Sequence, residues 1–517
     1  MLTILRSFIA RWYILFPIVL LGAYLRLYKI NEYLTFLGDE GRDVLVVKRM
    51  IVDGKWTLLG PTASVGGFYM GPVYYYFMAP FLWLWNLDPV GPAIMVALFG
   101  IATIILLYVI CEKIFGKYTA VIASTLYALS PVVIAYSRAS WNPNIVPFFS
   151  TLLLYITYII VKDRHWKYTF WIGVLFGIGL QLHYTFLFLI PVVILWLLIH
   201  GHTNEHFKWY GLIVVGFMVG FSPFIAFEFR HNFSNTRGII QFIAAGKDTG
   251  FSFITFFSNI QAVFFRLFAR LIIRIPDGGM FTALTDVQRN VWTCMSWLIA
   301  GVSLVVPFLL SRKIRTTPFV RQAIHLILLW LIIVLCSFGL YKKSIYDYYF
   351  GIFFTLPFIL FAISLDRIRY FGRIGKIVSI GAFAALIYFN WQGRPFAFEP
   401  NNQLEQTKIL ARAVLDKTDG KPFNFALITG GNSDQAYRYF FEIWGRPPVT
   451  IENTQIDPER KTVTDQLLII CEDPNCMPLG NSLWEVAGFG RAEIVGSWDV
   501  SVLKVYKLKH YTETLSP

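Results

Sequence analysis

Residues 12–30, WYILFPIVLLGAYLRLYKI, are followed by the charged stretch GDEGRD at residues 38–43, and this succession decides the fold. The first stretch is long enough to cross the roughly 30 Å hydrocarbon core of a bilayer as a helix. Arg6 and Arg11 precede it and place the N-terminus in the cytoplasm. The charged stretch is then expected on the opposite face, where ionisable groups beside a span are usually functional.

The composition is that of a polytopic membrane protein. Of 517 residues, 56% are hydrophobic, 18% aromatic and only 15% charged, and the mean hydropathy is +0.57. The first span lacks a small-residue cleavage site and is too long for a signal-peptide core, so we expect it to be retained. The net charge of +14 comes from basic residues in short loops between apolar runs, which fits membrane orientation and argues against nucleic-acid binding.

The apolar runs predict about eleven transmembrane helices. Threading them from a cytoplasmic N-terminus puts the later basic loops on the cytoplasmic side. The run 73–87 is an exception, because counting it as a span would move the later basic loops to the outer face of the membrane. Its length and its Tyr and Trp residues favour a re-entrant or interfacial helix over a true span. The eleven runs are 12–30, 91–111, 118–137, 145–161, 168–182, 184–199, 209–227, 291–310, 323–341, 348–365 and 377–391.

The chain is therefore expected to be mainly α-helical, with a small α/β domain at its C-terminal end. Residues 1–391 form the transmembrane module, with large outer loops at 31–90 and 228–290, and residues 392–517 form an extracytoplasmic domain. In that domain we predict strands at 423–429, 466–471 and 492–507 and a helix at 433–444 that Ser433 can cap.

Two of the five cysteines stand apart from the apolar runs. Cys471 and Cys476 are separated by four residues and could close a short disulfide in an oxidising compartment, although two free thiols in a loop are the alternative. A zinc site needs four ligands and this pair offers two. Cys111, Cys294 and Cys336 lie in apolar runs and read as packing residues.

The charged stretch carries the candidate catalytic residues, Asp39 and Glu40. On a helix, adjacent side chains point about 100° apart, so only one of them can easily face a substrate. Arg42 can share a face with Asp39, and a carboxylate beside a guanidinium is suited to taking a proton. The run 40–51 has the pattern of an amphipathic surface helix, and the alternative is that its charges only solvate that helix. We name no cofactor and no metal ligand, and leave a divalent cation open.

Polar residues also lie at the outer ends of several spans. Each has a plain alternative: Asn142, beside Pro143, can start a helix, His183 can serve a turn, and tyrosines can belong to an interfacial aromatic belt. The paired lysines are expected outside, where they suit a lipid phosphate. The candidates for substrate or donor binding are Arg138, Asn142, His183, Tyr184, Lys342, Lys343, Tyr346 and Tyr348.

Three motifs together resemble a known family. They are Asp-Glu-x-Arg at 39–42 with its amphipathic helix, Gly-Pro-Val-Tyr-Tyr at 71–75, and the loop around Arg138 and Asn142. This pattern resembles the membrane glycosyltransferases of the C-type (GT-C) fold, in particular the protein O-mannosyltransferase and lipid A aminoarabinose transferase group. The resemblance covers residues 15–191 and, more faintly, 346–357.

The resemblance implies a sugar donor on a polyprenyl phosphate, with Asp39 as the general base. Arg42 would hold the acidic site or the donor phosphate, and Asp43 and Tyr69 join the donor-binding candidates. Two positions depart from the aminoarabinose transferases. Met70-Gly71-Pro72 replaces their Lys-Pro-Pro motif, and Asn142 stands where they often have a second acidic residue. Phosphate neutralisation must then come from elsewhere, with Arg138, Arg230, Arg237, Lys342 and Lys343 as candidates.

We therefore expect a hexosyl- or pentosyltransferase of the cell inner or plasma membrane, acting on a lipid, glycan or protein acceptor at the outer face. The lipid donor agrees with the absence of a phosphate-cradling glycine-rich loop. The main alternative is a transporter or lipid flippase that uses the same charges for coupling, although transporters tend to place them within broken helices of repeated halves. A structural subunit with a partner-binding tail would leave the acidic stretch unexplained.

Overall fold

The computed structural model describes residues 2–63, 67–200, 206–245, 250–274, 283–313, 316–473 and 475–511. The chain packs as two compact units. The first contains Met1–Tyr28, Thr57–Phe77 and Ala93–Glu399, and the second contains Lys29–Trp56, Met78–Pro92 and Pro400–Pro517. These units are defined by packing alone, so the division at residue 391 with respect to the membrane stays a prediction.

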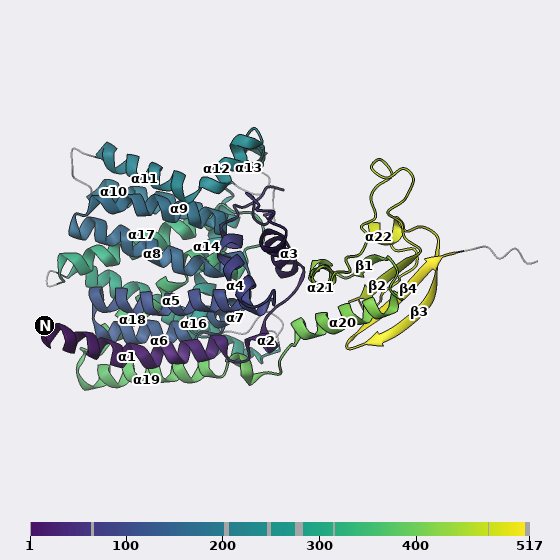
Figure 1. Ribbon diagram of the computed structural model, residues 1–517. Coiled ribbons are helices and arrows are strands. Elements are labelled where there is room, and N and C mark those ends of the chain that lie inside the picture. Colours follow the sequence, from purple (N-terminus) through teal and green to yellow (C-terminus); the bar gives the residue numbers. More distant parts are fainter. Residues whose placement is uncertain are drawn as a thin grey trace, which may run out of the picture. The chain divides into compact units, whose positions relative to one another are not determined.

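The first unit is a bundle of apolar helices (Figure 1), and the eleven predicted runs are largely helical over their described residues. Its elements are α1 (Leu2–Leu27), α6 (Lys117–Leu129), α7 (Pro131–Tyr136), η1 (Asn142–Ile145), α8 (Val146–Asp163), η2 (Trp166–Tyr168), α9 (Thr169–Leu182), η3 (Tyr184–Phe188), α10 (Leu189–His200), α11 (His206–Gly220), α12 (Ser222–Arg230), α13 (Ser234–Ala245), α14 (Phe253–Leu271), α16 (Asp286–Arg312), α17 (Pro318–Gly339), η4 (Asp347–Phe353), α18 (Thr355–Ile368), α19 (Gly372–Trp391) and η5 (Pro395–Ala397). Helices α4 (Val73–Leu84) and α5 (Val90–Phe115) each contribute to both units.

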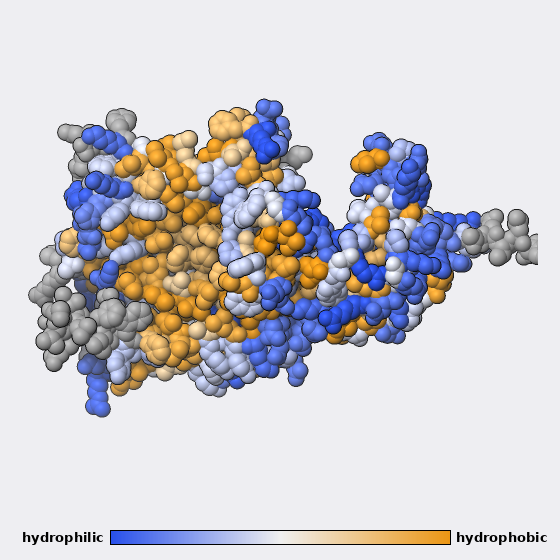
Figure 2. Space-filling view, viewed as in Figure 1, coloured by the Kyte–Doolittle hydropathy of each residue, from blue (hydrophilic) through white to orange (hydrophobic). Residues whose placement is uncertain are grey.

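The length and composition of its helices indicate that the chain is an integral membrane protein. Among the described helices, α5, η1 with α8, α16, α17 and α19 can each cross a bilayer. Two bent pairs would raise these five to seven: α11 with α12, bent by 73°, and η4 with α18, bent by 60°. Figure 2 shows apolar side chains gathered over the bundle, and α11, α16 and α19 expose such residues at Val214, Leu298 and Ile377. A surface this apolar is stable against lipid rather than water.

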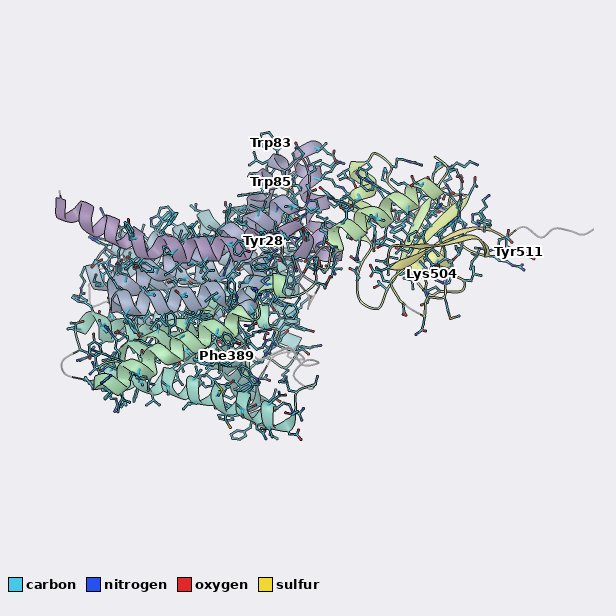
Figure 3. The ribbon with its side chains drawn as sticks, turned by 90° about the horizontal axis from the view of Figure 1, so that it is seen from below. Tyr28, Trp83, Trp85, Phe389, Lys504 and Tyr511 are labelled. Carbon is cyan, nitrogen blue, oxygen red and sulfur yellow. A yellow bond between two sulfur atoms is a disulfide. The ribbon has the colours of Figure 1, made fainter. Side chains whose placement is uncertain are left out.

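Helix α4 has 12 residues and contains Pro80, so it is too short to cross the membrane alone. At its C-terminal end Trp83 and Trp85 project outward (Figure 3), with 64% and 37% of their surfaces exposed. Amphipathic rings of this kind prefer the boundary between lipid and water. Both features favour the interfacial interpretation of this segment.

Close helix packing inside the bundle depends on glycine. Gly173 and Gly177 on α9 face Gly216 and Gly220 on α11, each pair four residues apart. A Cβ at Gly216 would stand 2.0 Å from the carbonyl oxygen of Phe170, and one at Gly177 would stand 2.6 Å from Gly220. Small residues at this spacing let two helix backbones touch, which is how spans associate in lipid.

A buried arginine closes one helix end within the bundle. Arg26, near the end of α1, is fully buried and donates to the carbonyls of Ala128 at 3.1 Å and Tyr127 at 3.5 Å. These carbonyls end α6, where they have no partner along the helix, and a cation there also suits the helix dipole. The sequence interpretation treated residues 12–30 only as an apolar span and missed this role.

The second unit is built on a four-stranded sheet (Figure 1) with strand order β1-β2-β4-β3, in which β1 and β2 are parallel and the other pairs antiparallel. The two parallel strands are buried along their whole length, as expected for strands covered on both faces. The elements are β1 (Asn424–Ile428), β2 (Gln466–Cys471), β3 (Ala492–Val500) and β4 (Leu503–His510), with helices α2 (Ile30–Tyr33), α3 (Gly38–Val52), α20 (Gln403–Lys417), α21 (Gln435–Ile443) and α22 (Trp484–Ala487).

Three details differ from the predicted tail. The run 492–507 is two strands rather than one, because Ser501, with φ of 54°, turns the chain between β3 and β4. Asp434, not Ser433, holds the cap position of α21, and it makes no side-chain cap bond. Helix α20 was not foreseen, although Leu404, Leu410, Ala411 and Val414 form a buried helical face.

The glycine contact between α9 and α11 makes a testable prediction. Replacing Gly216 with Val should lower the thermal midpoint in detergent, with a cost of about 3 kcal/mol, because the side chain enters space held by a backbone carbonyl. Gly211→Val on the same helix is the matched control, since a Cβ there meets nothing within 4 Å. Equal midpoints for the two variants would contradict this packing.

Candidate active site

The charged stretch forms the start of α3, in the second unit. Asp39 has 55% of its side chain exposed, and its Oδ1 lies 2.8 Å from Nη1 of Arg42. The same guanidinium reaches Oδ1 of the fully buried Asp43 at 2.8 Å from Nη2 and 2.9 Å from Nε. Arg42 therefore bridges an exposed and a buried carboxylate, and the spacing of three residues brings it onto the face of Asp39.

Glu40 lies in a different environment from its neighbour Asp39. It is buried, and its Oε2 accepts the backbone N–H of Leu37 at 3.1 Å. Burial raises the pKa of the Glu40 carboxyl to about 7, and the nearby Asp39 and Asp43 carboxylates act in the same direction. Glu40 thus anchors the start of α3, while Asp39 is the carboxylate that remains accessible.

The first unit contains a mainly apolar cavity of about 180 Å³. Its walls come from the loop before α4, from His183 and η3, and from α13, the end of α17 and η4. Aromatic rings dominate: Phe68 packs edge-on against Tyr184 and Phe242, with ring centres 5.1 and 5.6 Å apart. The lining also includes Met70, His183, Thr185, Phe188, Phe338, Tyr341 and Tyr349.

The loop that carries Tyr69 is fixed by its backbone. The Tyr69 N–H donates to Oδ1 of Asn235 at 2.7 Å, and Nδ2 of Asn235 donates back to the Tyr69 carbonyl at 3.0 Å. The Tyr184 hydroxyl donates to the same carbonyl at 2.5 Å. These bonds tie the loop to α13 and η3, so Tyr69 and Tyr184 help to shape the cavity wall.

His183 and the tyrosines of the later turn form one aromatic group. The His183 ring lies 5.2 Å from that of Tyr349 and 5.9 Å from that of Tyr348, which also contacts Trp141 at 4.4 Å. Tyr346 stacks on Tyr348 with a centre distance of 5.7 Å. Nδ1 of His183 also accepts the N–H of Thr185, so the residue caps η3 as well as lining the cavity.

Arg138 and Asn142 are turned toward backbone carbonyls. Arg138 is buried and donates from Nη1 to the Leu25 carbonyl at 3.0 Å and from Nη2 to that of Tyr28 at 3.0 Å. Nδ2 of Asn142, also buried, donates to the Leu182 carbonyl at 2.6 Å. These side chains close the C-terminal ends of α1 and α9, where helix carbonyls lack partners.

Lys342 and Lys343 are exposed on the turn that follows Tyr341. Asp347 holds this turn through ion pairs with Arg266 and Arg270 of α14. Nη1 of Arg266 also donates to the Ile345 carbonyl at 2.6 Å. These contacts fix the turn that carries the lysines. Lys342 directly follows the cavity residue Tyr341.

Sequence reasoning missed Arg266, Arg270 and Asn235. It assigned 228–290 to a loop and named Arg230 and Arg237 as its basic candidates; Arg230 is exposed, and Nη2 of Arg237 donates to the Asn232 carbonyl at 2.6 Å. The missed signal was the helical pattern of 253–271, which buries Val263, Leu267 and Leu271 on one face of α14. Residues 246–249 and 275–282 of this predicted loop lie outside the described residues.

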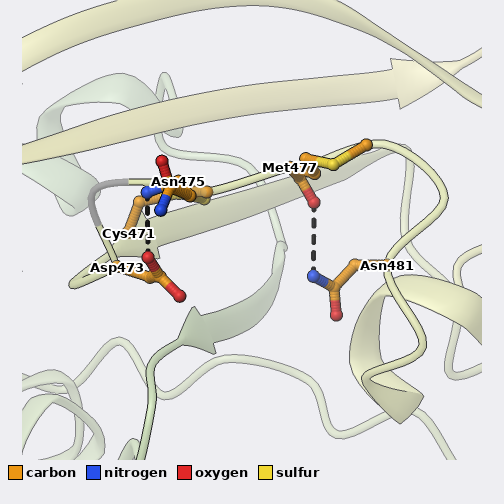
Figure 4. The surroundings of a disulfide bond; sticks show 6 residues. Cys471, Asp473, Asn475, Met477 and Asn481 are labelled. Atoms are coloured by element: carbon orange, nitrogen blue, oxygen red, sulfur yellow. Dashed lines mark hydrogen bonds between the residues drawn. A yellow bond between two sulfur atoms is a disulfide. The ribbon is translucent and has the colours of Figure 1, made fainter.

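No three His, Cys, Asp or Glu side chains of the described residues come together as a metal site. Cys471 and Cys476 form a disulfide, with Cα atoms 5.8 Å apart. Beside it, Asp473 accepts the Asn475 N–H at 2.8 Å (Figure 4), so the loop after β2 is fixed by a covalent link and a tight turn.

A family model supports part of the resemblance. Residues 70–227 match the model described as dolichyl-phosphate-mannose-protein mannosyltransferase. The match begins at Met70, in the cavity wall, and runs through the bundle to Phe227. A comparison with curated proteins gave no match.

Solved structures show the same fold over nearly the whole chain. ArnT from Cupriavidus metallidurans bound to undecaprenyl phosphate is 12% identical, with a TM-score of 0.62, and the match covers 97% of this chain and 98% of ArnT. The oligosaccharyltransferase of Archaeoglobus fulgidus, in complex with Zn and sulfate, is 15% identical, with a TM-score of 0.51, over 88% of this chain and 67% of the enzyme. The predicted fold, that of the GT-C membrane glycosyltransferases with a small C-terminal α/β part, is confirmed.

Proposed function

We propose that this protein is a glycosyltransferase that moves a sugar from a polyprenyl-phosphate donor to a lipid, glycan or protein acceptor, with Asp39 as general base. The family match, the shared fold and the undecaprenyl phosphate bound to ArnT support the donor class. One observation carries the assignment of the base. Of the three carboxylates in the first two turns of α3, Asp39, Glu40 and Asp43, only Asp39 is well exposed, and Arg42 orients it.

The proposed reaction is a displacement at the anomeric carbon. Asp39 takes the proton of the acceptor hydroxyl as its oxygen forms a bond to that carbon. The bond from the carbon to the phosphate oxygen breaks, and the electron pair leaves with the polyprenyl phosphate. A positioned base contributes about 10²- to 10⁴-fold, and the rest comes from orientation and from cations near the departing phosphate.

The cavity of the first unit suits the lipid end of such a donor. Its lining is mainly aromatic and aliphatic, which suits an isoprenoid chain. Lys342 and Lys343 follow Tyr341 in the chain and are exposed cations that can contact the phosphate. Arg266 and Arg270 pair with Asp347, and Arg138 donates to carbonyls, so the exposed Lys342 is our candidate ligand for the phosphate.

The proposed orientation follows the positive-inside rule. The N-terminus and the basic loops between spans lie in the cytoplasm, and α3, the lysine turn and the α/β part lie outside it. The membrane is the cell inner or plasma membrane. The sugar transferred is a hexose or a pentose.

Asp39→Asn tests the base directly. The amide keeps the size of the side chain but cannot take a proton, so kcat should fall at least about 100-fold. Transfer is measured with purified protein and a panel of radiolabelled polyprenyl-phosphate sugars, and donor binding by retention of the labelled lipid should stay within twofold. Asp53→Asn, at the other end of α3, is the control. Full transfer activity in Asp39→Asn would remove Asp39 from the mechanism.

Lys342→Gln tests the phosphate contact. Losing one charge-assisted hydrogen bond should raise KM for the donor about tenfold and lower kcat as well, because negative charge grows on the phosphate as it departs. Lys376→Gln is the control, since that lysine is exposed on α19. An unchanged donor KM in Lys342→Gln would assign the phosphate to other cations.

Glu40→Gln tests whether the second carboxyl is structural. With its pKa raised from 4.5 to about 7, folded Glu40 binds a proton more tightly than the unfolded chain does. The stability of the wild type should therefore fall as pH rises from about 4.5 to about 7, by up to about 3 kcal/mol. Glu40→Gln keeps the oxygen that accepts the Leu37 N–H, so the thermal midpoint should vary less between pH 5 and pH 8 while transfer persists. An equal pH dependence in the two proteins would contradict this role.

A further inference from the structure

The residue before helix α3 supplies no side-chain cap. The first N–H groups of a helix have no partner within it, and the residue before the helix usually supplies one from its side chain. Here that residue is Leu37, which has no acceptor. Instead the N–H of Gly38 donates to Oδ1 of Asn432 at 2.9 Å, across 394 residues of sequence but within the second unit.

Asn432 is itself held in one orientation. Its Oδ1 also accepts the N–H of Ser433 at 2.8 Å, and its Nδ2 donates to both oxygens of Glu472, at 3.2 and 3.1 Å. The Tyr437 hydroxyl donates to Oε1 of Glu472 at 3.0 Å. Since only the amide oxygen can accept and only the amide nitrogen can donate, Glu472 determines which atom of Asn432 faces α3.

The helix start touches the loop between β1 and α21 at backbone distance. A Cβ at Gly38 would lie 2.0 Å from Oγ of Ser433, and a Cβ at Gly41 would lie 2.3 Å from the backbone nitrogen of Ala436. Both glycines of the charged stretch are therefore required by this contact. Asp39 sits between them, on a turn that has no room to shift toward α21.

The other end of α3 is held by charge. Nη2 of Arg49 lies 2.8 Å from Oε2 of Glu442, and Nζ of Lys48 lies 3.2 Å from its Oε1. Glu442 belongs to α21, as does Tyr437. The whole helix thus lies along α21, fixed at its start by an amide and at its end by an ion-pair cluster.

The disulfide belongs to the same arrangement. Glu472 directly follows Cys471 and lies inside the short loop that the bond to Cys476 closes. A closed loop of this size restricts the backbone of the residues within it. The carboxylate that orients Asn432 is therefore carried on a covalently fixed loop.

We propose that Asn432, oriented by Glu472, is a positioning residue for Asp39, so that the C-terminal α/β part completes the active site. The proposal rests on the assignment of Asp39 as base. Asn432 fixes the N–H of the residue next to Asp39, and with it the direction in which the first turn presents its carboxylate. A displacement of about 1 Å at a catalytic group can cost about 100-fold in rate, so the loss of this contact should reduce kcat.

The first experiment needs no substrate. Amide hydrogen exchange of the peptide spanning residues 38–43 should speed up in Asn432→Ala, because the start of α3 loses its cap. Asn453→Ala is the matched control: Asn453 also accepts two backbone N–H groups through Oδ1, those of Gln455 and Ile456, but within its own turn. Unchanged exchange at residues 38–43 in Asn432→Ala would overturn the proposal.

The second experiment is kinetic. Asn432→Ala should lower kcat about 10- to 100-fold and leave KM for the donor within twofold, while Asn453→Ala stays at the wild-type values. Gly41→Ala, which forces α3 away from α21 without touching Asn432, should give the same pattern. Wild-type kcat in both Asn432→Ala and Gly41→Ala would also overturn the proposal.

A rescue separates positioning from general loss of structure. Asn432→Asp keeps the acceptor for Gly38 but sets two carboxylates against each other, and it should be slow. Adding Glu472→Gln reverses the donor and acceptor of the pair, and the double variant should regain most of the kcat and the slow exchange at residues 38–43. Failure of the double variant on both readouts would contradict the orienting role of Glu472.

Failure of the proposed function would look different. If Asp39→Asn retains full transfer activity while exchange at residues 38–43 still responds to Asn432→Ala, the base assignment fails and the contact remains only a structural one. If Asp39→Asn is inactive and Asn432→Ala is fully active, the function stands and the positioning proposal fails.

Discussion

The hydrogen bond from Gly38 to Asn432 is the contact on which the arrangement of the acidic helix depends. It supplies the cap that Leu37 cannot give, and it requires that Gly38 and Gly41 have no side chain. With the helix start in that position, Glu40 turns inward to the Leu37 N–H, Asp43 is buried, and Asp39 is left exposed beside Arg42. Two glycines that look like spacers in the charged stretch are contact residues.

Helix ends in the bundle also need hydrogen-bond partners from other parts of the chain. In lipid, no water donates to the backbone carbonyls at these ends. Arg26 caps the end of α6, and Arg138 caps the end of α1. A guanidinium has five donors and no acceptor, so one side chain can serve several carbonyls at once. Arginine at these positions is thus a structural requirement of buried helix ends. In the sequence, Arg138 lies at the outer end of a predicted span. An arginine there can bind a phosphate or cap a helix, and the sequence alone does not distinguish these two roles.

Most of the fold could be predicted from patterns of residues that are close together in the sequence. The apolar runs, the buried strand 466–471 and the i, i+3 relation of Asp39 and Arg42 all depend on residues close in sequence. Contacts between distant residues were out of reach. Nothing in the stretch 38–43 indicates Asn432, and nothing in 342–348 indicates that Arg266 and Arg270 hold Asp347. The split of 492–507 at Ser501 was missed because a left-handed turn residue need not be glycine.

The order of the chain has a consequence for how the proposed site forms. The second unit takes residues 29–56 and 78–92 from the early part of the chain and Pro400–Pro517 from its end. Helix α3 is made early, but Asn432, Tyr437, Glu442 and Glu472, which hold it, are made last. Contacts this distant in sequence form only after the intervening chain is in place, since closing so large a loop costs entropy that only the native contact returns. The helix that carries Asp39 can therefore reach its final position only when the α/β part has folded, and a chain with its spans inserted but its C-terminal part unfolded would hold the carboxylate without the contacts that direct it.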